Sequence, residues 1–192
     1  EVKLLIFLSL FIMNEDPKLS TAFFGGGCFW CIEAAFSDLK GVSKVESGYS
    51  GGSEVNANYK SVSAGITNHA EICKITYDPK KISYETLVKI FFTAHDPTTY
   101  NRQGNDIGPQ YRSIIFFNKK NEFDLIEKII NEMERDGIYE KIVTETEPFQ
   151  KFYKAEDYHQ NYYENNPKQP YCSYVIKPKL QKLRKQLKQF YN

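Results

Sequence analysis

Hydrophobic positions in the first part of the chain change between strand and helix spacing. The short β-branched and aromatic stretch at 20–24 predicts a strand. Apolar residues recur at helical spacing from Ile32 to Leu39 and predict the helix that follows it. Alternating positions at 42–49 and 69–77 predict two further strands. The chain therefore begins with the order strand, helix, strand, strand.

The second part of the chain continues this alternation. Ser83 is a good N-cap for a helix that ends near His95. A strand is expected at 112–117, a charged helix at 119–135 and another strand at 142–148. Connections of both hairpin and helix length predict an α+β fold. We expect a two-layer sandwich of a mixed β-sheet with packed helices, which is a ferredoxin-like core with extensions.

The two ends of the chain have their own patterns. An apolar run from Leu4 to Met13 is too short to span a bilayer, which takes about 20 residues. It has the length of a signal-peptide core, but no small-x-small cleavage motif follows it. We expect 1–19 to be an apolar extension, either signal-like or upstream of a true start at Met13. Residues 20–192 then form one domain that includes a C-terminal amphipathic helix. Since the apolar run lacks a cleavage motif, we expect a cytoplasmic protein. If the run is nevertheless a signal sequence, the protein is exported.

The last helix is amphipathic, with apolar residues from Ile176 to Leu187 at helical spacing between six basic residues. A helix docked on the domain with a solvated basic face is favoured over a membrane-surface helix, so no stable membrane association is expected. The whole chain has 25 basic and 24 acidic residues, and this balance argues against nucleic-acid binding.

The candidate chemistry begins at a Gly-rich turn between the first strand and helix. Three glycines precede Cys28 there and leave it at or near the helix N-terminus, where the unpaired N–H groups favour a thiolate. On the strand at 69–77, Glu71 shares a face with Cys73 and Ile75, and it is the only acid among them. Cys73 is expected in the core.

Five segments carry a family resemblance. The chain resembles the peptide methionine sulfoxide reductase A family over about residues 20 to 180. The matching motifs are Gly-Cys-Phe-Trp at 27–30, Gly-Tyr at 48–49, Asn-His-Ala-Glu at 68–71, Asn-Arg-Gln-Gly-Asn-Asp-Ile-Gly-Pro-Gln-Tyr-Arg-Ser at 101–113 and Phe-Tyr-Lys-Ala-Glu-Asp-Tyr-His-Gln at 152–160. One departure is Asn68, where the family usually has glycine.

The resemblance implies thiol-dependent reduction of methionine sulfoxide, of the S epimer at sulfur, free or in proteins, as a repair of oxidised proteins. Cys28 would attack the sulfur and become a sulfenic acid. Glu71 would give the proton, and it can do so only if burial keeps it protonated. Tyr59 and Tyr111 would hydrogen-bond the sulfoxide oxygen. No cofactor is implied, and we expect a monomer.

Substrate-binding roles also follow from the resemblance. Phe29 and Trp30 would form an apolar pocket for the substrate methyl group, and Asp106 would bind the substrate backbone amide. His159 lies in a matched motif and is a further substrate-binding candidate, although a structural histidine fits the sequence equally well.

A second thiol must reduce the sulfenic acid, and two candidates exist. Cys172 sits where family members place a resolving cysteine, but no glycine follows it to free the tail. Cys31 is three residues from Cys28, at the spacing of redox pairs. The partner expected to restore the thiols is thioredoxin or a similar dithiol.

Two other functions stay open at this point. A thioredoxin-like disulfide oxidoreductase could use Cys28-Phe-Trp-Cys31, but it leaves Glu71 and the 106–111 segment unexplained. A zinc-stabilised binding module could use the four cysteines. A single C-x-x-C with no second ligand pair argues against it, so no metal is expected.

Overall fold

The structure is a computed structural model that describes residues 18–192. The apolar run Leu4–Met13 and the expectations attached to it lie outside the described residues. Within the described range, none of the helices has the length and apolar character that crossing a membrane requires.

In the described part of the chain, six strands form one sheet in the order β7-β6-β1-β3-β2-β8. Neighbouring strands pair antiparallel, except that β6 and β7 run parallel. The sheet is therefore mixed, as expected. The strands are β1 (Ser20–Gly25), β2 (Val42–Ser50), β3 (Ala70–Tyr77), β6 (Ile114–Phe117), β7 (Glu145–Pro148) and β8 (Tyr153–Lys154).

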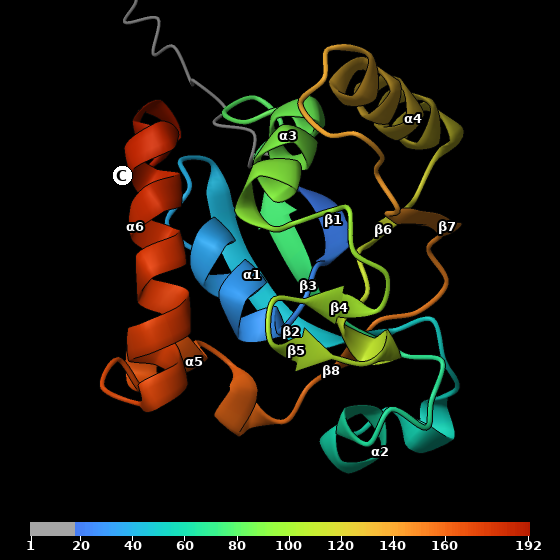
Figure 1. Cartoon of the computed structure of the whole chain (residues 1–192), viewed down its shortest axis with the longest axis vertical. Helices are drawn as coiled ribbons and strands as arrows, with labels where there is room; N and C mark the ends of the chain where they lie inside the picture. The colour runs from blue at the N-terminus through green and yellow to red at the C-terminus, as the bar shows by residue number, and fades with distance from the viewer. Residues whose placement is uncertain (1–17) are drawn as a thin grey trace, which may run out of the picture.

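Helices cover one face of this sheet, with α1 between α6 and α3 and with α4 beyond α3 (Figure 1). The order β1-α1-β2-β3-α3-β6 with strand neighbours β6-β1-β3-β2 is the ferredoxin-like arrangement, so the expected two-layer α+β fold is confirmed. The longer helices are α1 (Phe29–Phe36), α3 (Tyr84–Ala94), α4 (Lys120–Arg135) and α6 (Lys177–Gln186).

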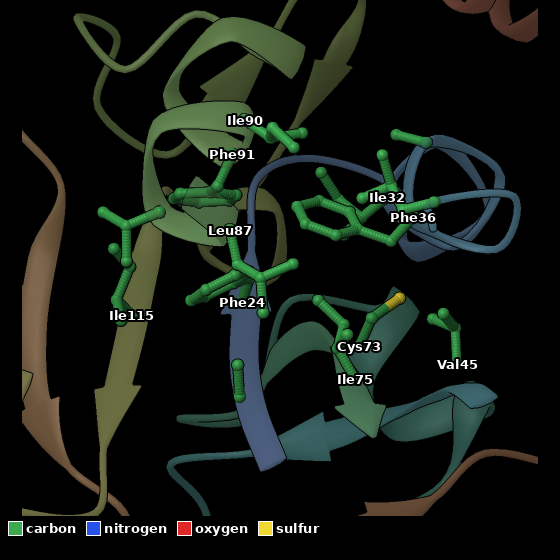
Figure 2. Packing of buried hydrophobic residues seen from close by; sticks show 14 of the residues in the cluster. Phe24, Ile32, Phe36, Val45, Cys73, Ile75, Leu87, Ile90, Phe91 and Ile115 are labelled. Carbon is green, nitrogen blue, oxygen red and sulfur yellow. The ribbon is translucent and has the colours of Figure 1, made fainter. Parts of the chain in front are cut away.

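The main hydrophobic core lies between the sheet and these helices. Figure 2 shows Phe24 of β1 and Ile75 of β3 facing Ile32 of α1 and Phe91 of α3. Cys73 lies in this core, as expected, and its thiol donates to the Phe29 carbonyl at 3.3 Å. The chemistry-bearing helix is thus packed directly on the strand that carries Glu71.

Short elements surround one end of the sheet and build the site. They are η1 (Glu54–Asn56), α2 (Tyr59–Ser63), the hairpin β4 (Arg102–Gln103) and β5 (Asp106–Ile107), η2 (Pro109–Tyr111), η3 (Asp157–His159), α5 (Tyr162–Asn165) and the π-helical turn η4 (Cys172–Ile176). The last turn, η5 (Lys188–Phe190), lies beyond the C-terminal end of α1, where the Phe190 carbonyl accepts from the amide of Lys40. The 101–111 segment, expected as a loop, contains the hairpin and one 3-10 turn.

Two strands are shorter than expected. The strand expected from residue 142 begins at Glu145, because the amide of Ile142 donates to the Glu134 carboxylate and that of Val143 to the Pro97 carbonyl. These bonds hold the segment against α4 and a loop rather than against β6. Likewise, β6 begins at Ile114 and not at residue 112.

The C-terminal helix α6 is docked on the domain. Leu180 and Leu183 are buried, and the Tyr191 hydroxyl donates to the Ala35 carbonyl of α1 at 2.8 Å. Most of its basic side chains lie on the exposed side. This helix continues from η4 and so holds the tail segment beside α1.

Candidate active site

A tight turn joins β1 to α1 and places Cys28 as the N-cap of α1. A Cβ at Gly25 would lie 2.7 Å from the Glu71 carbonyl oxygen, so only glycine lets β1 pass so close to β3 there. Gly27 has φ of 88°, in the left-handed region that favours glycine. The turn therefore brings Cys28 directly beside the strand that carries Glu71.

The resting thiol of Cys28 differs from the sequence expectation. Its side chain is buried, with 8% of the residue exposed, and burial raises the pKa of the thiol well above its usual value. Neighbouring Cys31 and the charge of Glu71 raise this pKa further. The amide of Phe29, which could have stabilised a thiolate at the helix end, is bonded to Glu71 instead. The resting state favours the thiol.

Glu71 has the environment that proton donation needs. It lies on β3, is 2% exposed and accepts a hydrogen bond from the amide of Phe29 at 3.0 Å. Burial raises the pKa of this carboxyl to about 8, although the bond from Phe29 opposes the shift. The carboxyl is therefore largely protonated at neutral pH and can act as an acid.

Two tyrosines lie near this carboxyl and come from separate elements, α2 and η2. The carbonyl of Tyr111 accepts from the amide of Gly27 at 3.1 Å, and the amide of Tyr59 donates to the Glu156 carboxylate at 2.9 Å. Burial first, and then the nearby charge of Glu71, raise the pKa of both phenols. Both are therefore neutral O–H donors close to Glu71.

An aromatic wall flanks the thiol. The indole of Trp30 stacks on Tyr162, with ring centroids 3.6 Å apart, and its Nε1 donates to Nδ1 of His159 at 3.2 Å. Phe29 is only 1% exposed and packs against His159 with centroids 5.0 Å apart. Trp30 therefore offers the accessible apolar surface, and Phe29 lies behind it.

The tail enters the site through Tyr171, which the sequence analysis did not assign. Its hydroxyl donates to the Asp106 carboxylate at 2.6 Å and lies 3.7 Å from the Cys31 sulfur. Cys172 is fully buried in a small apolar cluster that includes Cys31 and Trp30. In one sequence nothing distinguishes Tyr171 from the other tyrosines, because its role depends on where the tail docks.

Most of the residues expected in the site thus come together. Cys28, Glu71, Tyr59 and Tyr111 lie close enough for their charges to influence one another, and Trp30 and His159 belong to the adjoining aromatic wall. Three others lie at its tail side, namely Cys31, Asp106 and Cys172. For residues 18–192, no three His, Cys, Asp or Glu side chains gather as a metal site.

Comparisons with known proteins show the family of this chain. The family model described as peptide methionine sulfoxide reductase matches residues 20–191. The chain belongs to this family. A relative described as peptide methionine sulfoxide reductase MsrA, from Trichodesmium erythraeum, is 49% identical over 168 residues, which cover 87% of this chain and 95% of the relative.

Solved structures of the family share the fold. Mxr1 from Saccharomyces cerevisiae in its reduced form superposes with a TM-score of 0.75 at 36% identity, covering 82% of this chain and 91% of Mxr1. Mxr1 in complex with Trx2 gives a TM-score of 0.53 at 27% identity, covering 79% of this chain and 90% of that one. The alternative of a thioredoxin-like disulfide oxidoreductase is therefore not favoured.

Proposed function

We propose that this protein reduces methionine sulfoxide, the S epimer at sulfur, free or in proteins, to methionine. The observation that carries the proposal is the buried carboxyl of Glu71, bonded to the amide of Phe29 beside the buried thiol of Cys28 at the start of α1. Burial raises the pKa of this carboxyl to about 8, which keeps it largely protonated at neutral pH. A nucleophile at sulfur and a proton donor for oxygen are the two groups that this reduction requires.

The first step transfers the oxygen from the substrate to the enzyme. Cys28 sulfur attacks the sulfoxide sulfur while Glu71 protonates the oxygen, and Glu71 regains a proton from the thiol. The attack forms an S–S bond between Cys28 and the substrate. The protonated oxygen then moves to the Cys28 sulfur, so that a new S–O bond forms there while the substrate S–O bond and the S–S bond break. The products are methionine and a Cys28 sulfenic acid, so the substrate sulfur is reduced and Cys28 is oxidised. Tyr59 and Tyr111 stabilise the oxygen as charge develops on it.

The remaining side chains bind the substrate. Trp30, backed by Phe29, contacts the methyl group, and Asp106 accepts a hydrogen bond from the substrate amide after the Tyr171 hydroxyl leaves it. His159 is a neutral histidine whose pKa burial lowers, and within the described chain its Nε2 has no partner. His159 is only 1% exposed and its Nε2 is buried, so we propose that it contributes to substrate binding indirectly, through its bond with Trp30.

Cys31 is the thiol that we propose resolves the sulfenic acid. The hydrogen bond with Cys28 is the largest cause that lowers the pKa of Cys31, and the residue is partly exposed. Its attack on the sulfenic acid forms a Cys28–Cys31 disulfide and releases water. Cys172 stays the second candidate, because it packs in the same cluster as Cys31. Thioredoxin or a similar dithiol then reduces the disulfide, which the complex of Mxr1 with Trx2 supports.

We propose a cytoplasmic location, because a reducing compartment would return Cys28 and its resolving partner to the thiol state after each turnover. Export stays the alternative if the run Leu4–Met13 acts as a signal.

Incubation with separated methionine sulfoxide epimers tests the function. Purified protein receives one epimer, free or within a peptide, together with a dithiol, and methionine is quantified. We expect methionine from the S epimer, whereas the R epimer stays intact. Absence of product from both epimers would overturn the proposed function. Cys28→Ser protein, treated in the same way, controls for reduction by the dithiol alone.

A further inference from the structure

Glu33 has a buried carboxylate that takes no part in the proposed reaction. Glu33 lies on α1 and is 1% exposed. Its Oε1 accepts from the amide of Asn161 at 2.9 Å, and its Oε2 accepts from the amide of Tyr162 at 3.0 Å. A buried carboxylate is costly unless such bonds satisfy it. Both of its oxygens thus hold one short stretch of distant backbone against α1.

The stretch that Glu33 holds has an unusual backbone. Asn161 has φ of 51°, a left-handed conformation that costs energy for a residue other than glycine, although asparagine tolerates it best. It leads directly into the short helix α5, whose first residue is Tyr162. The side chain of the preceding Gln160 is bonded to the backbone of Ser47 and Ala155, so it anchors the start of the turn independently of Glu33. Without Glu33 the amides of Asn161 and Tyr162 would still lose their partners, and it is these two residues that lead into the ring packed on Trp30.

The same stretch fixes the orientation of Trp30. Tyr162 covers one face of the indole with nearly parallel rings, 5° apart, and His159 accepts the indole N–H. Trp30 and Glu33 are three residues apart on α1 and so lie on the same side of that helix. Glu33 therefore connects the helix that carries Trp30 to the segment that packs on Trp30.

We propose that Glu33 is a positioning residue for the substrate site, acting through the 159–162 segment on the indole of Trp30. This inference rests on the proposed function, because Trp30 is the wall for the substrate methyl group. Glu33 itself does not touch the substrate. A fixed indole binds ground state and transition state alike, so the effect of Glu33 falls on KM rather than on kcat.

The test is the isosteric variant Glu33→Gln. The side-chain amide of glutamine has one oxygen and one NH₂ group. Its NH₂ must therefore face one of the two backbone N–H groups, so that hydrogen bond is lost and two donors are left pointing at each other. We expect KM for a sulfoxide peptide to rise about five- to tenfold with kcat within about twofold of wild type. Trp30 is the only tryptophan of the chain, so its fluorescence reports the indole directly. We expect stronger acrylamide quenching in the variant.

A matched control separates positioning from lost stability. Glu134 also accepts a backbone amide, that of Ile142 at 2.7 Å, and it lies on α4 away from the site. Glu134→Gln should lower the melting temperature but leave KM and Trp30 quenching unchanged. If both variants raised KM equally, or if Glu33→Gln left KM and quenching at wild-type values, the proposal would be overturned.

Tyr162→Leu keeps the proposal testable if Glu33→Gln does not fold. It retains the amide held by Glu33 but removes the ring from the indole. The same rise in KM and in quenching is expected, and wild-type behaviour of both would contradict the proposal. Quenching is measured without turnover. A wild-type protein that reduced no sulfoxide would therefore refute the proposed function, while the quenching data would still report on the positioning of Trp30.

Discussion

Two regions of the molecule meet at Cys28, and they are built differently. The first is β1, α1 and β3, in which paired strands and the main core bring Cys28 and Glu71 together. The second is the segment 156–176, which carries His159 and Tyr162, the two residues that pack on Trp30, together with Tyr171 and Cys172. The first region supplies the reacting groups, whereas the second shapes the space in front of them.

The forces that hold the two regions also differ. The first region is held together by backbone hydrogen bonds between paired strands and by the main hydrophobic core. The second is tied by side chains that accept or donate to backbone groups, namely Glu33, Glu156 and Gln160. Substitutions in the first region should therefore lower the rate of the chemical step. Changes in the second should alter substrate binding and thiol resolution.

The largest effect is expected for Cys28→Ser. A serine hydroxyl in the same buried position is a far weaker nucleophile, so we expect kcat to fall by at least about a thousandfold. The fold should survive, since the substitution is nearly isosteric, and circular dichroism with a melting curve would check this. Turnover above a tenth of wild type would remove Cys28 from the role of nucleophile.

Glu71→Gln should have the next largest effect. Loss of a positioned acid should slow the reductive step by about a hundred- to thousandfold, measured as single-turnover methionine formation. The wild-type rate should fall as pH rises through about 8, where the carboxyl loses its proton, and the variant should lack this decline. A wild-type rate in Glu71→Gln would assign proton donation to another group.

The same carboxyl predicts a trend in stability. Its folded-state pKa is raised from 4.5 to about 8, so its contribution to the free energy of unfolding is complete below 4.5 and is lost as pH rises through about 8. Across this interval wild type should lose stability relative to Glu71→Gln, as seen in urea midpoints at each pH. Parallel curves for the two proteins would contradict a buried, neutral Glu71.

Cys31→Ser tests which thiol resolves the Cys28 sulfenic acid. Steady-state turnover with thioredoxin should fall at least about tenfold, while single-turnover methionine formation should stay near wild type, because resolution follows the chemical step. Cys172→Ser serves as the matched control on the tail side. If the control lost steady-state turnover and Cys31→Ser did not, resolution would belong to Cys172, and peptide mapping should then find a 28–172 link.

The smallest effects are expected at the two phenols. Tyr59→Phe and Tyr111→Phe each remove one neutral donor to the sulfoxide oxygen while the other remains, so kcat should fall by about tenfold in each variant. The double variant should lose more than either. Equal rates for wild type and both single variants would show that Glu71 alone stabilises and protonates the sulfoxide oxygen.

The sequence predicts the first region well and the second poorly. Local hydrophobic spacing indicates β1, α1 and β3. The role of Glu71 follows from the family motif at 68–71, because a strand glutamate by itself more often faces water or a lysine. The bonds that position Glu33 and Tyr171 join residues 128 or 65 positions apart, and no local pattern encodes them. The prediction of a thiolate at Cys28 was wrong for the same reason. Burial raises the pKa of this thiol, and burial depends on how distant parts of the domain pack over the turn.

The most direct test of the central claim is a single turnover without reductant. The wild-type protein is mixed with an excess of a peptide that contains the S epimer of methionine sulfoxide, and methionine and modified cysteines are counted by mass spectrometry. We predict one methionine per protein molecule and the loss of the free Cys28 thiol in the same ratio, as a sulfenic acid or a disulfide. Methionine formed while Cys28 remained a free thiol would contradict this mechanism.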